Sequence, residues 1–239
     1  VVLLTLRNAH HLGRIGAYGE IAMEHGLISL HLVNVTDHLP SVAPWGGVES
    51  RFVTNPVCIA VPGTEKTPPT LLDMATSRIA IGKARVAMSK GEDLDPGMVI
   101  DSEGEPTTDP SVMYEKPRGA LLPFGDHKGS GLSLMCELLA GGLSGGGTIQ
   151  PGNPRQESIV NNMFAVVVDP SRLVDVEWLR AEIDATVAYV KSARPAAAET
   201  PVIVAGDKER IQNAARSADG IEINDQAWEE MHAAAARLD

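Results

Sequence analysis

RNAHHLGRIGAYGEIA, residues 7–22, joins two apolar segments through a turn rich in histidine and glycine, and it decides which fold this chain can have. The residues before it, VVLLTL at 1–6, predict a buried strand, and the apolar spacing after the turn predicts a helix over 15–25. A Rossmann domain needs G-x-G-x-x-G between such a strand and helix. GRIG at 13–16 has the wrong spacing, so any dinucleotide site here has to be built in another way.

The overall composition is that of an ordinary globular protein. The chain has 239 residues, 44% of them hydrophobic and 21% charged, which suffices for one large domain or two small ones. A formal net charge of −11 argues against a nucleic-acid or anionic-membrane partner. No apolar run reaches the roughly 18 residues of a membrane span. Cys58 and Cys136 lie far apart in apolar surroundings, which indicates reduced core thiols of a cytoplasmic protein.

Strand and helix patterns alternate along the rest of the chain and predict the α/β class with a mixed sheet. Apolar runs predict further strands at 27–35, 56–63, 163–170 and the start of 201–220. Helices are predicted from about 77 to 90, over 130–143, over 175–193, and at the C-terminus after Asn224. We expect the first of these to be capped near Thr76 and ended by Gly91, and the second, apolar nearly all round, to be buried.

Two turns ahead of predicted helices carry reactive side chains. In HHLGRIG, residues 10–16, a histidine at a strand end can bind a carboxylate or move a proton, and amides at a helix start favour anions. The alternative is a capping histidine with two turn glycines; a metal site lacks a third ligand. DMATS, residues 73–77, offers amides and hydroxyls to phosphate and a carboxylate to a ribose, or is an ordinary N-cap.

Two further turns carry cations or amides. PFGDHKGSG, residues 123–131, sets Lys128 among glycines, so it can reach into a cleft as a fixed charge for phosphate or a carboxylate. A solvated turn fits less well, because three glycines cost backbone entropy without a packing gain. VAGDKER, residues 204–210, either completes an anion or ribose site or is a helix capped by Asp207. The asparagine pair at 161–162 either lines a cleft or closes a turn.

Taken in this order, these stretches resemble the type-2 malate/L-lactate dehydrogenases, which are NAD(P)-dependent reductases of 2-oxo and related acids. The resemblance runs through almost the whole chain. It is carried by NAHHLGRIGAYGE (8–20), APWGGVESRFVTNP (43–56), LDMATSRIAIGKARVAMSKG (72–91), PFGDHKGSGLSLMCELLAGGLSGG (123–146), NNMFAVVVDP (161–170) and AGDKERIQNAARSADGIEI (205–223). It implies a mixed-sheet dinucleotide-binding fold that is not a Rossmann domain, and a homodimer.

The resemblance also implies the roles of individual residues. His11 matches a histidine that is named as the acid/base in some members. The implied cofactor is NAD or NADP, the implied partner is a small 2-oxo or 2-hydroxy acid, and no metal is implied. The positions that match cofactor contacts are Arg14, Ile15, Gly16, Asp73, Met74, Ala75, Thr76, Ser77, Lys128, Asn162, Gly206, Asp207 and Lys208.

Family members are longer at the N-terminus, where a serine–histidine pair supplies the histidine commonly assigned as proton donor. We therefore expect a truncated or incompletely represented member. Residues 1–194 form a cofactor-binding mixed-sheet region with central helices, and residues 195–239 form a C-terminal strand and helices that pack on the missing helical segment.

The leading hypothesis for the function is hydride transfer between a nicotinamide and a 2-oxo or 2-hydroxy acid of the malate, lactate or aromatic hydroxycarboxylate type. One alternative is a catalytically silent nucleotide-binding or dimerisation fragment that lacks the proton donor. The other is a metal-dependent hydrolase that uses the histidines, although no carboxylates or histidines stand at coordinating spacing.

Overall fold

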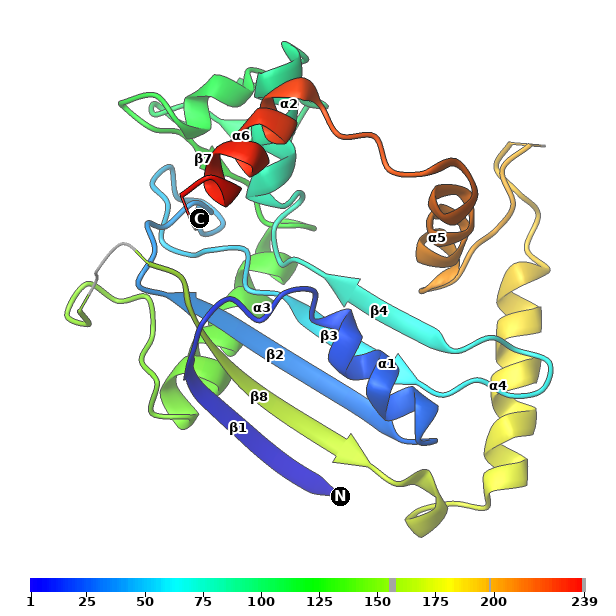
Figure 1. Ribbon diagram of the computed structural model, residues 1–239. Helices are drawn as coiled ribbons and strands as arrows, with labels where there is room; N and C mark the ends of the chain where they lie inside the picture. Colours follow the sequence, from blue (N-terminus) through cyan, green and yellow to red (C-terminus); the bar gives the residue numbers. More distant parts are fainter. Residues whose placement is uncertain (155–157, 198, 238–239) are drawn as a thin grey trace.

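A five-stranded antiparallel sheet organises most of the chain (Figure 1). The computed structural model describes residues 1–154, 158–197 and 199–237. The strands of this sheet are β1 (Val2–Ala9), β2 (Ile28–Thr36), β3 (Val57–Val61), β4 (Thr70–Met74) and β8 (Val160–Val168). Their order is β1-β8-β2-β3-β4, and each pairing is antiparallel. β4 is therefore an edge strand, with one side free of strand partners.

Helices cover both faces of this sheet, as Figure 1 shows. α1 (Gly16–Glu24) lies on one face and α3 (His127–Cys136) on the other. Side chains alternate along β2 to match, because successive residues of a strand point to opposite faces. Val33 packs with Ile15 in the core cluster beneath α1, and Leu32 packs with Cys136 in the cluster beneath α3. A π-helical turn, η2 (Glu137–Leu143), continues α3.

A smaller region is built on a three-stranded sheet with the order β6-β5-β7. Its elements are α2 (Ile81–Lys90), β5 (Val99–Ile100), β6 (Pro106–Thr107), the 3₁₀ turn η1 (Pro110–Met113) and β7 (Ala120–Leu121). A separate core cluster centred on the fully buried Val42, Val99 and Leu121 holds it together.

After β8 the chain passes through η3 (Pro170–Arg172) into α4 (Val176–Lys191), α5 (Asp207–Asp219) and α6 (Asp225–Ala235). In Figure 1, α4 stands beside the sheet and α6 lies next to α2. An ion pair of 2.7 Å between Arg85 and Glu230 joins α2 to α6. The further expectation that residues 195–239 pack on an N-terminal helical segment stays a prediction.

Several expectations from the sequence are confirmed. The fold is α/β without a doubly wound parallel sheet. Gly91 ends α2 in the left-handed conformation, with φ of 67°, and the Asn224 side chain accepts from the Ala227 N–H as the N-cap of α6. Cys58 and Cys136 are free and buried, and burial raises the pKa of each thiol to about 12. Among the described residues, no helix is long and apolar enough to cross a membrane.

Other expectations were wrong. The strand predicted at 1–6 forms as β1, but it is not buried, since Leu3 is 68% exposed. The helix predicted from about 77 begins only at Ile81, and the Thr76 side chain does not cap it. The reason is that Ser77 bridges to Pro123 and Arg78 N–H donates to the Leu122 carbonyl, so this segment runs extended beside its neighbour. The strand β4 was missed because polar Thr70 and Asp73 stand among the five residues of its TLLDM pattern.

The helix over 130–143 and the strand at the start of 201–220 also needed correction. The first is α-helical only to Cys136, and it is not buried all round, since Leu138 is 50% exposed. At 201–205 no strand forms, because Pro201 cannot donate to a ladder and the chain already turns at Gly206.

Candidate functional site along the free edge of β4

Asp73, on β4, connects two of the predicted site segments. Its Oδ2 accepts a hydrogen bond of 2.9 Å from the Gly16 N–H and lies 3.8 Å from Nη1 of Arg14. Burial raises the pKa of Asp73, against the lowering effects of the Gly16 hydrogen bond and the Arg14 charge. Asp73 thus holds the HHLGRIG turn through Oδ2, and its Oδ1 is not used for a hydrogen bond within the described residues.

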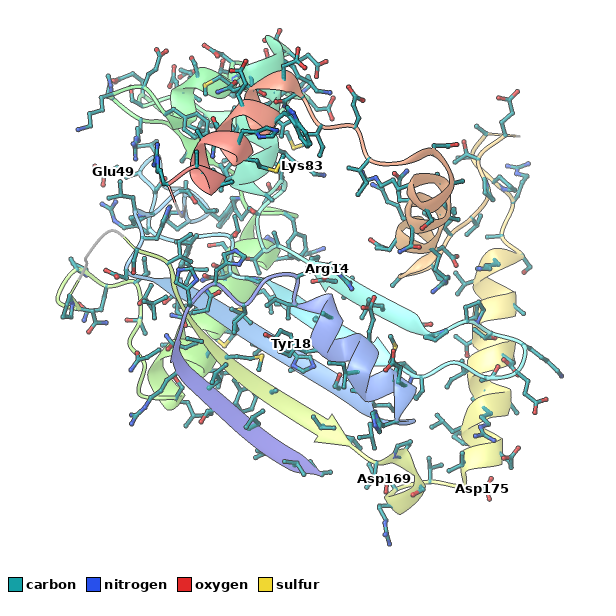
Figure 2. All side chains as sticks on the ribbon, in the orientation of Figure 1. Arg14, Tyr18, Glu49, Lys83, Asp169 and Asp175 are labelled. Atoms are coloured by element: carbon teal, nitrogen blue, oxygen red, sulfur yellow. The ribbon has the colours of Figure 1, made fainter. Side chains whose placement is uncertain are left out.

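The turn that Asp73 holds has one residue anchored in the core and one exposed. Ile15 is buried in the core cluster beneath α1, whereas Arg14 is exposed and also pairs with Glu20. Figure 2 shows Arg14 at the end of α1 nearest to β4. A Cβ on Gly16 would lie 2.5 Å from Oδ2 of Asp73, closer than van der Waals contact permits. Glycine at 16 is therefore what lets the helix start touch the carboxylate.

His11 is exposed at the other side of this turn. Its Nδ1 accepts a hydrogen bond of 2.9 Å from the Gly13 N–H, which assigns the proton of the neutral ring to Nε2. Nε2–H is thus available as a donor. A ring protonated at both nitrogens would have to give up the Gly13 bond, because Nδ1 would then carry a hydrogen as well.

Asn161 and Asn162 fix the backbone of the same turn. Asn162 Oδ1 accepts from the Asn8 N–H, and Asn161 Oδ1 accepts from the Leu12 N–H, each at 2.9 Å. Asn162 is fully buried, and its Nδ2 donates to Oδ1 of Asn34 at 3.0 Å. Its amide therefore holds the turn in place, whereas the predicted direct contact of Asn162 with a cofactor stays a prediction.

The rest of the 73–77 segment packs against the loop that carries Lys128. The Phe124 N–H donates to the Thr76 carbonyl at 3.1 Å. A Cβ on Gly129 would lie 2.6 Å from that same carbonyl oxygen, so glycine permits this approach. Lys128, the residue before Gly129, is exposed and has no ion-pair partner among the described residues. A free cation therefore lies beside the turn that follows Asp73 and Met74.

The hydroxyls of this segment do not match the sequence-based interpretation. Thr76 and Ser77 are buried, and their hydroxyls donate to the carbonyls of Thr54 and Ile79 at 3.1 and 2.7 Å. Both hydroxyl protons are thus used inside the protein. What remains for a ligand at Ala75–Ser77 is the backbone and the neighbouring Lys128, not a row of free hydroxyls.

The start of α5 reaches the free edge of β4 from the opposite end. Gly206, at φ of 91°, packs on Leu71, because a Cβ there would lie 3.1 Å from the Leu71 nitrogen. Asp207 accepts from the Val204 N–H at 2.9 Å, while the next residue, Lys208, is exposed. The negative charge of Glu209 is close enough to contribute to the raised pKa of Asp73. The structure therefore places the predicted segments at 10–16, 128 and 206–208 around β4 and the turn that follows it, which together contain the segment at 73–77.

Sequence reasoning missed a buried polar cluster beneath this arrangement. Glu137 is 3% exposed, and its carboxylate accepts hydrogen bonds from the side chains of Asn34 and Asn55 and from the Ile149 N–H. One signal for it exists, since Glu137 is the only charged residue between Gly131 and Leu143. In the part of the chain that the structure describes, no group of three or more His, Cys, Asp or Glu could hold a metal ion.

Comparison with known proteins places this geometry in a family. The family model described as malate/L-lactate dehydrogenase matches residues 1–232. The chain belongs to the malate/L-lactate dehydrogenase family. It is 46% identical over 236 residues to an L-lactate dehydrogenase of Cupriavidus necator, covering 99% of this chain and 67% of that protein. It is 39% identical over 240 residues to hydroxycarboxylate dehydrogenase B of Escherichia coli K12, covering 100% of this chain and 65% of that protein.

Solved structures agree with this assignment. A malate dehydrogenase from Pyrococcus horikoshii superimposes with a TM-score of 0.80 at 30% identity, over 99% of this chain and 65% of that one. A sulfolactate dehydrogenase from Methanocaldococcus jannaschii gives 0.75 at 31% identity, over 95% and 64%. The chain thus spans about two thirds of the length of the family members it matches.

Proposed function

We propose that this chain is the cofactor-binding and chemical part of an NAD(P)-dependent 2-hydroxyacid dehydrogenase, which moves a hydride between a nicotinamide and a 2-oxo or 2-hydroxy acid. The observation that carries the proposal is that Gly16 contacts Asp73 while Gly206 packs at Leu71 on the same strand, β4, in a chain of this family. Similarity to lactate, malate and sulfolactate dehydrogenases supports the substrate class.

The residues on this edge fit a dinucleotide. Oδ1 of Asp73, which accepts no hydrogen bond within the described residues, can accept from a ribose hydroxyl or a carboxamide. The first turn of α5 has backbone N–H groups without helical partners, which favour a phosphate. Lys128 supplies an unpaired charge for a phosphate or the substrate carboxylate. When bound, the nicotinamide supplies the hydride acceptor or donor.

We propose that His11 binds an oxygen atom of the substrate. Its Nε2–H can donate a hydrogen bond to a carbonyl or carboxylate oxygen, which would orient and polarise a 2-oxo acid. Delivering a proton requires a further change, because a ring protonated at both nitrogens has to give up the hydrogen bond that Nδ1 accepts from the Gly13 N–H. The proposed role is therefore orientation by hydrogen bonding, with proton delivery coupled to a change in the turn. A homodimer and a cytoplasmic location stay predictions.

The experiment compares Lys128→Ala with Lys116→Ala, an exposed lysine of the smaller region that has no ion-pair partner among the described residues. Calorimetry would measure the affinity for NADH and NADPH, and cofactor absorbance would follow turnover with pyruvate, oxaloacetate and phenylpyruvate. We expect Lys128→Ala to weaken binding of cofactor or substrate by roughly 1–3 kcal/mol, the scale of a lost charge-assisted hydrogen bond. Lys116→Ala should match the parent.

Different failures have different meanings. Equal binding and equal kinetics in the parent and in Lys128→Ala would remove this lysine from the site. Binding of a dinucleotide without any turnover would leave a nucleotide-binding module and contradict the proposed activity for this chain. Failure to bind either dinucleotide would contradict the proposed function as a whole.

A further inference from the structure

A cavity of about 630 Å³ opens between the end of α4 and the start of α5, at the Gly206 end of the β4 edge. Cations predominate on its walls, which carry Lys191, Arg194 and Arg210 and one carboxylate, that of Asp207. Apolar side chains, among them Ile203 and Ile211, form the rest of the lining. The cavity therefore combines a positive field with an apolar surface, which suits a phosphorylated aromatic ligand.

The single carboxylate in the cavity is already engaged. Its Oδ2 lies 2.8 Å from Nζ of Lys191 and accepts from the Val204 N–H, and its Oδ1 lies 2.5 Å from Nη2 of Arg210. Burial would raise the pKa of Asp207, but these hydrogen bonds and charges lower it to about 2. The carboxylate thus stays charged and paired, and two cations share it.

Arg194 has no such partner. Among the described residues no hydrogen bond or ion pair reaches its guanidinium, and it is exposed on the cavity wall. Arg210 is also held on its other side, since its Nη1 donates to the Pro69 carbonyl at 2.6 Å. The cavity therefore has a net positive charge, with Arg194 as the free cation and a fixed framework around it.

The cavity also lies where one end of a long ligand would reach. Arg210 and Gly206 both contact the chain where β4 begins, and the 73–77 turn with Lys128 lies where β4 ends. A strand of five residues spans about 13 Å at roughly 3.3 Å per residue. A ligand that reaches both ends has to be elongated and to carry an anion at the α5 end.

We propose that this cavity binds the phosphorylated adenosine ribose of NADP(H), and that Arg194 selects NADP(H) over NAD(H). The proposal rests on the proposed function and specifies its cofactor. In Rossmann dinucleotide sites a free acidic residue at the adenosine ribose favours the unphosphorylated 2′-hydroxyl, whereas a nearby arginine accommodates the 2′-phosphate, and the same charge argument applies to any pocket for this ribose. Here the acid is neutralised by Lys191 and Arg210, and the free group is an arginine.

The test measures the affinity of the whole chain for NADPH, NADH and 2′,5′-ADP by calorimetry, in the parent, in Arg194→Ala and in Arg172→Ala. Arg172 is 81% exposed in the short turn before α4, and Asp169 is its one ion-pair partner among the described residues, so this control removes the same charge away from the cavity. We expect the parent to prefer NADPH. Arg194→Ala should bind NADPH and 2′,5′-ADP about tenfold more weakly, which is about 1.4 kcal/mol, and should bind NADH nearly unchanged.

Two results would overturn the proposal. If the dinucleotides bind but the parent does not prefer NADPH, or Arg194→Ala behaves like Arg172→Ala, the selection by Arg194 is wrong while the proposed function stands. If neither dinucleotide nor 2′,5′-ADP binds, both proposals fall. If 2′,5′-ADP alone binds and weakens in Arg194→Ala, the cavity assignment holds and the hydride-transfer activity is what fails.

Discussion

Replacing Glu137 by glutamine tests whether the buried polar cluster holds the fold beneath the site. Oε2 of Glu137 accepts from Nδ2 of Asn34 at 3.0 Å and from the Ile149 N–H at 2.8 Å, and Oε1 accepts from Nδ2 of Asn55 at 2.8 Å. Glutamine has one acceptor oxygen. Placed to keep the two bonds to Asn34 and Ile149, it turns its own NH₂ group toward the NH₂ of Asn55.

The expected cost follows from these three bonds. Asn55 cannot simply flip its amide, because its Oδ1 accepts from the Val35 N–H. A buried donor left without an acceptor costs about 1–3 kcal/mol, and each of the two kept bonds falls from a charged to a neutral one, a loss of about 1 kcal/mol. Against this, glutamine avoids burying a charge. We expect Glu137→Gln to lower the free energy of unfolding by about 2–4 kcal/mol.

Urea denaturation followed by circular dichroism measures this change, as a lower midpoint at an unchanged slope. Glu182→Gln, on an exposed position of α4, is the control and should stay within about 0.5 kcal/mol of the parent. Burial raises the pKa of Glu137, so above the ordinary pKa of a carboxyl group the folded chain holds a proton that the unfolded chain has lost. The free energy of unfolding of the parent should therefore decrease as the pH rises through this range, and the glutamine variant should lack this trend. A Glu137→Gln variant as stable as the control would refute the reasoning.

Two further predictions concern stability. Gly129→Ala should destabilise the fold by about 1–3 kcal/mol, because its Cβ would overlap the backbone of Phe124 and Thr76. The Cβ of Gly131→Ala, in the same helix, meets open space, so that variant should be neutral or stabilising. Equal denaturation midpoints for the two variants would contradict this. Burial lowers the pKa of His31, so below about pH 6.5 the unfolded chain binds a proton that the folded chain does not. The free energy of unfolding should therefore decrease as the pH is lowered, by up to about 1.4 kcal/mol per pH unit. His31→Phe should remove that part of the slope between pH 6.5 and 5.5, and an unchanged slope would show that His31 does not titrate in this way.

Local signals let the sequence predict the ends of elements well. Gly26 and Gly91 adopt φ of 69° and 67° after α1 and α2, and Asn224 caps α6, because each of these choices depends on a few neighbouring residues. The start of α2 was misplaced for the opposite reason. Residues 77–78 bond to residues 122–123, more than forty positions away, and no local pattern contains that pairing.

The candidate site, too, has features that the sequence predicts and features that depend on distant residues. The four chemistry-bearing turns could be found from residue type and glycine spacing, and their order pointed to the family. Their meeting point could not be found, because it depends on β4 being an edge strand. The Glu137 cluster was out of reach as well, since Asn34 and Glu137 are 103 positions apart. A lone carboxylate in an apolar helix indicates a buried partner without naming it.

The free edge of β4 explains how a chain without the Rossmann fingerprint could still hold a dinucleotide. That fingerprint supplies glycines for close approach and a helix start for phosphate from one turn, with an acid for a ribose about 20 residues further along. Here the same three features come from separate segments, with Gly16 at one helix start, Asp73 on the strand and Gly206 at another helix start. An unpaired sheet edge presents backbone groups that need cover. Because Gly206 meets this edge at Leu71 and Asp73 lies two residues further along, the strand itself sets the spacing between the acid and the second helix start. A substitution that shifts the register of β4 by one residue would move Asp73 to the opposite face and away from Gly16, so binding should depend on this register more than on any single contact.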